Sequence, residues 1–476
     1  MTAQEPDAGA PLRDGQDRLA GRGRWAALRR STDMAGLAGC AAIYAIGQGC
    51  NVLFQLLLLR NFGADGYGQI GLSHLAFLLV FFVGDLGYAT VFLRETPTAV
   101  GWERQWRLAL GHKFMVTLGL YAATLVGWAL AYGRGTEGFA YLAATVPAGL
   151  IGLVSPAPAL LAQQRRMASF LLQQIPWPAA LLFWWLVGGA NGSALHAGLI
   201  VSAGFAMQPI VSLLVGGRLR LLLPAFGSGG TMLGASVKLS VMGITGALHD
   251  RLTPFLIARL APDFLPLMLI LGHGMNGASG ILTQVNRLLL PQMSTRAGLL
   301  WSYRLVTILL LGMATLFQLF LLITAATADG GASLRLPLLL PTVMAWGFSL
   351  VGSVLANELI GRHRETQLIR IVLIGLTVSS ALQILGTAGS SPDGVLWART
   401  ICSVGMAVAC FRLCGIVPGV AGWALCASLV LAALAATSHA IWALSVLLFA
   451  GATVAVVSMQ PLLLRQSSAL AENLRR

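Results

Sequence analysis

Polar side chains recur at helical spacing inside the apolar stretches of this sequence. One set, near the N-terminus, has spacings of 4, 3 and 4 residues and comprises Tyr44, Gln48, Asn51 and Gln55. A second set has spacings of 3, 4, 4 and 3 residues and comprises His273, Asn276, Gly280, Gln284 and Arg287. Such spacing stacks each set on one helix face. Polar side chains in a membrane helix either bond neighbouring helices or line a wetted cavity, and several on one face favour the cavity.

Two further stretches each place an ionisable pair on one predicted helix face. His74 and Asp85 are eleven residues apart, as are Lys238 and His249. At 100° per residue, that separation brings the two side chains of each pair within roughly 20° of each other. The four stretches together predict four helices around a central polar cavity.

The densest intramembrane charge is the sequence His249-Asp250-Arg251. Neighbouring side chains on a helix point about 100° apart, so Asp250 and Arg251 each need a partner elsewhere. One interpretation is structural pairing with another helix. The other is a cation that holds an anionic substrate, with a nearby acid for ion or proton coupling.

A guanidinium binds two phosphate oxygens at once, and this attraction strengthens where water is excluded. The candidates for holding such a charge are Arg251, Lys238 and Arg287. Candidates for hydrogen bonding a polar substrate are Gln48, Asn51, Gln55, His273, Asn276 and Gln284. The ion-coupling candidates are Asp85, Asp250 and His249. Glu358 and Arg362, four residues apart, predict a helix-end salt bridge instead.

Composition indicates what must position these residues. The chain has 476 residues, of which 57% are hydrophobic and only 10% charged, and a mean hydropathy of +0.77. An average soluble protein is about a quarter charged, so a water-soluble globular enzyme is excluded. No Walker A loop or HExxH motif is present, and the six cysteines lack metal-ligand spacing. We therefore expect no enzyme, no cofactor and no metal site.

The fold expected is an all-α polytopic membrane protein with about fourteen transmembrane helices, since apolar runs of about twenty residues recur throughout. A weak repeat at an offset of 198 residues indicates two pseudo-symmetric six-helix lobes plus two C-terminal helices. The predicted helices span 35–59, 70–93, 110–132, 138–162, 169–189, 194–216, 231–258, 266–290, 301–325, 334–359, 367–387, 395–415, 419–437 and 440–464. The predicted parts are a disordered Arg-rich tail (1–34), an N-lobe (35–216), a linker (217–230), a C-lobe (231–415) and a C-terminal part (416–476).

Charge placement predicts the orientation. The chain has 31 basic and 17 acidic residues, a net charge of +14. Of the basic residues, 24 fall in the tail and in every second inter-helix segment, five fall in the other segments, and two lie within one predicted helix. The positive-inside rule then predicts that both termini are cytoplasmic. This assignment also accounts for the net charge without nucleic-acid binding.

Several short motifs resemble those of one transporter branch. At the first two predicted helices, the matching positions are Arg60, Gly63, Asp65, Gly68, Asp85, Gly87 and Arg94. Later matches are the LLLPQMS ending of the eighth helix, with Gln292 where alanine is usual, and the turn at Gly361, Arg362 and Arg364. These resemble the polysaccharide-exporting, Wzx-like flippases of the multidrug/oligosaccharidyl-lipid/polysaccharide (MOP) superfamily. The stretch Leu-Ala-Pro-Asp at 260–263 departs from the Gly-rich turn of that branch.

The resemblance implies a flippase of the bacterial inner membrane. Its substrate would be an undecaprenyl-diphosphate-linked oligosaccharide for exopolysaccharide, capsule or O-antigen, and polysaccharide polymerase and chain-length machinery would be partners. A lipid II flippase and a MATE-like drug or cation exporter of the same superfamily are alternatives, and the exporter predicts an acidic rather than basic cavity. A membrane glycosyltransferase or polymerase would need catalytic acids on longer loops.

Overall fold

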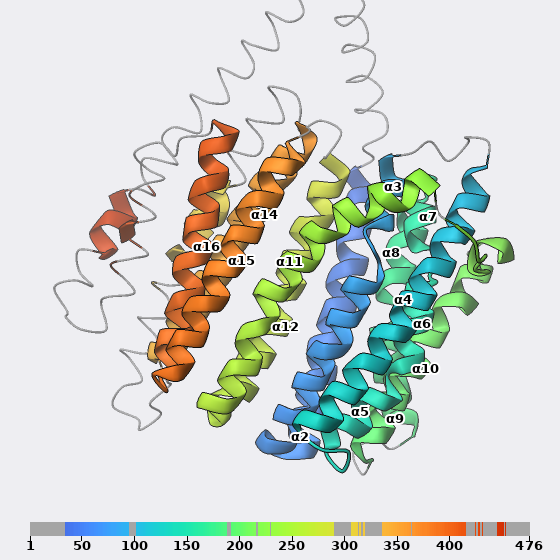
Figure 1. Ribbon diagram of the computed structural model, residues 1–476, viewed down its shortest axis with the longest axis horizontal. Coiled ribbons are helices and arrows are strands. Elements are labelled where there is room, and N and C mark those ends of the chain that lie inside the picture. Colours follow the sequence, from blue (N-terminus) through green and yellow to red (C-terminus); the bar gives the residue numbers. More distant parts are fainter. Residues whose placement is uncertain are drawn as a thin grey trace, which may run out of the picture.

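The computed structural model is helical throughout the part that it describes (Figure 1). That part comprises residues 34–94, 101–187, 192–215, 218–228, 230–289, 336–362 and 364–415, with scattered residues between 306 and 318 and between 424 and 453. The predicted tail and the predicted helices at 301–325, 419–437 and 440–464 lie wholly or mostly outside the described residues. The prediction of an all-α, multi-span membrane fold is confirmed.

We call the helices before residue 216 the N-terminal bundle. They are α2 (Met34–Gly84), α3 (Tyr88–Arg94), α4 (Trp102–Ala131), α5 (Glu137–Ala144), α6 (Val146–Leu153), α7 (Ala157–Ala162), α8 (Arg166–Gln174), α9 (Pro176–Leu186) and α10 (Ala194–Leu214). The described helices from residue 230 to 415 form what we call the C-terminal bundle. They are α11 (Gly230–Leu260), α12 (Leu265–Leu289), α14 (Leu336–Gly361), α15 (Glu365–Ala388) and α16 (Pro392–Cys414).

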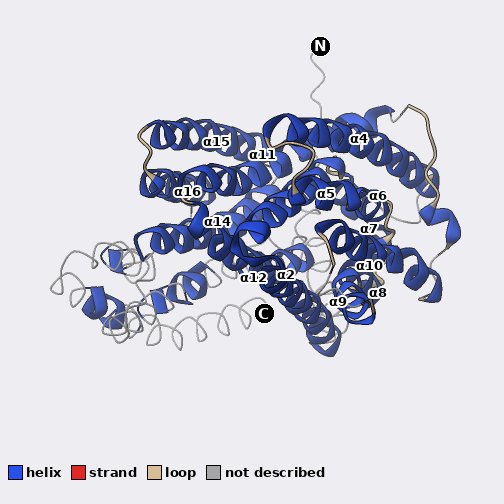
Figure 2. Cartoon of the chain, turned by 90° about the horizontal axis from the view of Figure 1, so that it is seen from below, coloured by secondary structure: helices blue, strands red, loops and turns tan. Residues whose placement is uncertain are grey.

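The two bundles lie side by side, with α11 and α12 between α2 and the group α14 to α16 (Figures 1 and 2). Seven described segments are long and apolar enough to cross a membrane, and the first runs from Gly39 to Gly84. At 1.5 Å per residue, those 46 residues are too long for one crossing of a hydrocarbon core about 30 Å thick. The helix breaks at Gly63, where φ is 68°, and turns back on itself. The Tyr67 hydroxyl consequently donates to Gln55 Oε1 across the turn (3.3 Å).

Prolines explain where the structure divides predicted single helices. The stretch predicted as one helix at 138–162 forms α5, α6 and α7, with Pro147 in the first turn of α6 and Pro156 at the start of α7. The stretch predicted at 169–189 divides into α8 and α9 just before Pro176. Proline has no N–H to donate and clashes with the preceding turn, so a new helix begins there. Pro209, by contrast, lies within an unbroken α10.

The connection between the bundles packs onto α4. Ala225 N donates to Arg107 O (2.8 Å), and Trp106 Nε1 donates to Leu221 O (2.9 Å). One turn further along α4, the His112 imidazole bonds Gly227 O (2.7 Å). These bonds tie residues 218–227 to the N-terminal bundle.

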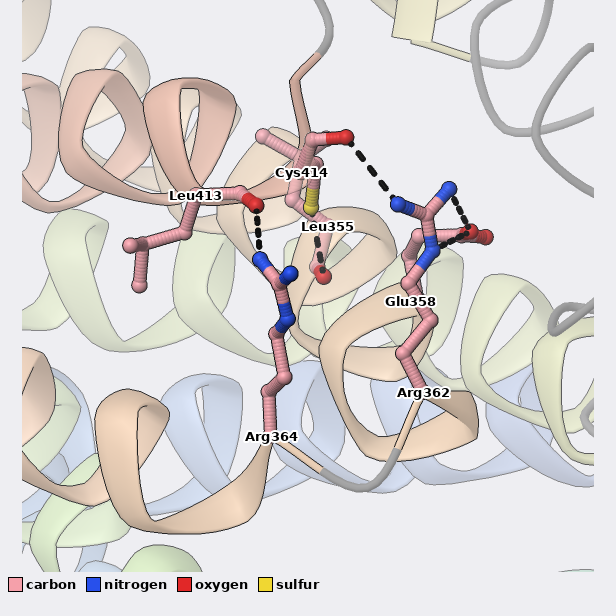
Figure 3. A network of polar contacts seen from close by, with 6 residues as sticks. All are labelled: Leu355, Glu358, Arg362, Arg364, Leu413 and Cys414. Atoms are coloured by element: carbon pink, nitrogen blue, oxygen red, sulfur yellow. Dashed lines mark hydrogen bonds and ion pairs between the residues drawn. The ribbon is translucent and has the colours of Figure 1, made fainter.

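At the corresponding end of the C-terminal bundle, arginines from the turn between α14 and α15 hold the last turn of α16 (Figure 3). Arg362 forms the predicted salt bridge with Glu358 (2.7 Å) and also donates to Cys414 O (3.2 Å). Arg364 donates to Leu413 O (2.8 Å). The terminal carbonyls of a helix have no partner within the helix, and guanidinium groups satisfy them here. This network joins α14, α15 and α16 into one unit.

Candidate functional site

The two bundles meet where α2 packs against α12, and glycines allow the close approach (Figure 2). On the first half of α2, Tyr44 and Gln48 reach the backbone of α12 at Gly280 and Gly277. On the second half, Gly71 faces Leu269 of α12 in the same way. We call this contact, together with the neighbouring face of α11, the bundle interface. The four helices predicted to surround a cavity correspond to the first half of α2, the second half of α2, α11 and α12, and all four contribute to this interface.

Two histidines meet across the bundle interface. His74 of α2 is fully buried, and His273 of α12 is 2% exposed. Their ring centroids are 5.3 Å apart. His74 Nδ1 bonds the Tyr141 hydroxyl of α5 (2.9 Å), and Trp177 of α9 lies 5.6 Å from the same imidazole. The Nε2 atoms of both histidines are buried without a hydrogen-bond partner in the described part of the protein.

Arg251 of α11 approaches α2 about two turns beyond His74. Its side chain is 9% exposed, and its guanidinium carbon is 5.2 Å from the ring centroid of Phe82 on α2. Residues from α2, α11 and α12 therefore converge on one basic region between the bundles.

The polar face of the first half of α2 is used partly within the N-terminal bundle. Gln48 Nε2 donates to Gln174 Oε1 of α8 (2.9 Å), and Gln55 accepts from Tyr67. Asn51 Oδ1 and Gln55 Nε2 are nevertheless buried without a partner among the described residues. A buried polar atom without a partner costs about 1–3 kcal/mol, so native proteins keep few of them. Asn51 and Gln55 share a helical face with Tyr44 and Gln48, which contact α12, so these two atoms are available to a polar ligand on that face.

Asp85 lies elsewhere. Helix α2 ends at Gly84, and the left-handed conformations of Leu86 and Gly87 redirect the chain, so the predicted shared face with His74 does not form. The Asp85 carboxylate forms an ion pair with Lys113 of α4 and accepts from Ala89 N of α3 (3.4 Å). Asp85 therefore bonds within the N-terminal bundle.

The remaining candidates divide into three groups. His249 points into the C-terminal bundle, where its Nε2 contacts Ser403 Oγ of α16 (3.3 Å). Asn276 is exposed on α12. The side chains of Lys238, Asp250, Gln284 and Arg287 lie outside the described ones, and their roles stay predictions. Among the described residues, no three His, Cys, Asp or Glu side chains are grouped to hold a metal.

The sequence analysis did not identify Lys113, Tyr141 and Trp177 as interior partners. It began the third predicted helix at residue 110, whereas α4 begins at Trp102, which places Lys113 three turns inside the helix. That side chain is only 2% exposed. The basic residues at 104, 107 and 113 obscured the start of the helix, although their spacing of about one to two turns was a usable signal. Tyr141 and Trp177 stand in apolar runs without any distinguishing spacing.

No family model and no curated protein sequence matches this chain. Solved structures do match. The lipid II flippase MurJ, in an inward closed conformation, aligns with a TM-score of 0.61 over 89% of this chain and 99% of its own, at 11% identity. The MATE multidrug transporter DinF-BH aligns with a TM-score of 0.60 over 80% and 95%, at 15% identity. A MOP superfamily transporter from Pyrococcus furiosus aligns with a TM-score of 0.55 over 80% and 94%, at 11% identity.

These similarities show that the chain has the fold shared by MOP superfamily transporters. They agree with the expectation of a multi-pass membrane protein. At identities of 11–15%, they define the fold and leave the substrate open.

Proposed function

We propose that this protein is a flippase that moves an undecaprenyl-diphosphate-linked oligosaccharide across the bacterial inner membrane. The diphosphate and sugar head would pass between the two bundles as they rock, and the lipid tail would stay in the bilayer. Both termini would lie in the cytoplasm, as the distribution of basic residues predicts.

The observation that carries this proposal is the basic character of the bundle interface. Arg251 is a buried cation among the described side chains where α11 approaches the second half of α2, away from the turn at Gly63 that carries the exposed Arg60 and Asp65. A guanidinium in a low-dielectric region suits a diphosphate better than a cationic drug. Lys238 and Arg287, on the same two helices as Arg251 and His273, are proposed to extend this charge toward the cytoplasmic side.

The sugar head requires hydrogen-bonding groups instead of charge. Asn51 and Gln55 each keep a buried polar atom without a partner, among the described residues, beside the interface. Gln48 lies against Gly277 of α12, so separation of the bundles would expose its amide. We propose that these three side chains, with Asn276 and Gln284 on α12, bond sugar hydroxyls. A capsule, O-antigen or exopolysaccharide unit would each offer such hydroxyls.

A lipid II flippase is the second candidate. The MurJ structure aligns over 89% of this chain, against 80% for the two other structures described above. Lipid II also carries a diphosphate between its lipid and its sugars, so the same basic interface suits it. Loss of viability after gene deletion, with a block in cell-wall synthesis, would favour this candidate over a surface polysaccharide.

Gene deletion with complementation tests the proposal. Deletion should abolish one surface polysaccharide and trap its lipid-linked intermediate on the cytoplasmic face, and Arg251→Ala should fail to restore export. Arg259→Ala, an exposed arginine two turns further along α11, is the matched control and should restore it. Normal polysaccharide with altered drug sensitivity after deletion would overturn the flippase assignment in favour of an exporter.

A further inference from the structure

We propose that His74 and His273 form a proton-binding site whose occupancy separates the two bundles. The site is distinct from the three ion-coupling candidates of the sequence analysis. One imidazole comes from each bundle, the ring centroids are 5.3 Å apart, and both side chains are almost fully buried. The proposal rests on the rocking movement proposed above, but it does not depend on the identity of the substrate.

The groups around the pair make the packed arrangement compatible with neutral imidazoles only. Among the described groups, Tyr141 of α5 bonds His74, the neutral Trp177 of α9 packs against the same imidazole, and the cation Arg251 of α11 lies along the same interface against Phe82. None of these is a carboxylate that could balance a positive charge. Two imidazolium ions at this distance would repel each other and would both be repelled by Arg251.

The hydrogen bonds leave each imidazole able to take up a proton. His74 Nδ1 bonds the Tyr141 hydroxyl, and its Nε2 has no partner among the described residues, as is true of His273 Nε2. In the packed arrangement a proton at either Nε2 would find no acceptor there. After separation, water would reach these atoms and hydrate the imidazolium. A transition metal is a poorer fit, because Arg251 repels a cation and contributes no ligand.

The consequence follows from linkage. Packing of the bundles and protonation of the pair exclude each other. Binding of a proton therefore shifts the equilibrium toward the separated state, and packing of the bundles releases the bound proton. If the proposed substrate is correct, its diphosphate would also stabilise the protonated pair together with Arg251. Protons and substrate would then bind to the separated state together, and each would raise the affinity for the other.

The experiment measures the distance between the bundles against pH in the absence of substrate. Spin labels are placed on Arg134→Cys, in the turn after α4, and on Ser390→Cys, in the turn after α15, with the six native cysteines replaced. The purified protein in lipid nanodiscs is measured between about pH 7.5 and about pH 5.5, where imidazole titrates. We expect the separated population to rise about tenfold or more as the pH falls.

His273→Gln should abolish this rise, and His74→Gln should do the same. His273 makes no hydrogen bond in the described part of the structure, so its substitution is the milder of the two and serves if His74→Gln fails to fold. The exposed His196→Gln is a control that should retain the rise. A wild-type distance independent of pH, or a shift that persists in His273→Gln, would overturn the proposal. Neither outcome depends on whether the protein flips a lipid.

Discussion

Gly280 of α12 should be intolerant of any side chain, because Tyr44 of α2 occupies the space beside it. A Cβ added at Gly280 would lie 1.5 Å from the Tyr44 hydroxyl oxygen and 2.3 Å from the ring carbon that bears it. Ordinary contacts between such atoms are about 3.5–4 Å. The tyrosine ring, and not only its hydroxyl, must therefore move by about 2 Å, or the two bundles must part.

The cost of this overlap can be estimated. Overpacking of a well-packed contact costs about 1–3 kcal/mol. If the bundles relieve the overlap by separating, the equilibrium between the packed and separated states shifts by about 5- to 150-fold. The gain in helix propensity from glycine to alanine, up to about 1 kcal/mol, acts on the helix in both states and does not offset the shift.

The assay is the same distance measurement between labels on the two bundles, at fixed neutral pH. Gly274→Ala is the matched control, because a Cβ at Gly274, on the same helix, meets nothing within 4 Å. Gly280→Ala should increase the separated population and Gly274→Ala should not. Adding Tyr44→Ala to Gly280→Ala removes the overlap and should return the population toward that of Tyr44→Ala alone. Identical behaviour of Gly280→Ala and Gly274→Ala would refute the packing argument.

Two further predictions concern stability, measured as thermal unfolding of the purified protein in detergent. Lys113→Met should lower the free energy of unfolding by about 3 kcal/mol, because it leaves the partly buried Asp85 without its cation. The double variant Lys113→Met with Asp85→Asn should recover most of that loss. Equal stability of the single and double variants would contradict the argument from the ion pair. Arg362→Ala should cost more than Arg364→Ala. The former removes an ion pair to the fully buried Glu358 carboxylate and a bond to Cys414 O, whereas the latter loses one bond to a carbonyl, worth about 1 kcal/mol. The reverse order would contradict the argument from the ion pair.

The fold could be predicted from the sequence because the bilayer imposes strong constraints. Apolar runs long enough to span it must be helical, so composition and run length sufficed for the class and for most boundaries. Helices α10, α11, α12, α15 and α16 begin and end within about three residues of their predicted limits. The predicted helix boundaries differ from the observed ones where a new helix begins at Pro156 and at Pro176. They also differ at α4, whose first two turns carry charged residues and were therefore not predicted as helix.

The candidate site could be predicted only in part. Helical spacing places His273 and Gly280 of α12 on one face, and both contact α2, whereas Asn276, predicted on the same face, is exposed. It cannot indicate which bundle supplies a partner, so it paired His74 with Asp85, where the structure pairs His74 with Tyr141 and brings it against His273. It also cannot anticipate a helix end such as the one before Leu86 and Gly87, whose left-handed backbone conformations redirect the chain. Contacts between helices that are distant in sequence can be identified only from the folded structure.

The basic bundle interface is proposed to move a diphosphate-linked lipid. The most direct test reconstitutes the purified protein in liposomes and follows the transfer of an undecaprenyl-diphosphate-linked oligosaccharide between leaflets, with a cationic dye as the competing substrate. We expect transfer of the lipid by the wild type and by Arg259→Ala, a loss of at least about tenfold in Arg251→Ala, and no transport of the dye. Transport of the dye without transfer of the lipid, or full transfer by Arg251→Ala, would contradict the proposal.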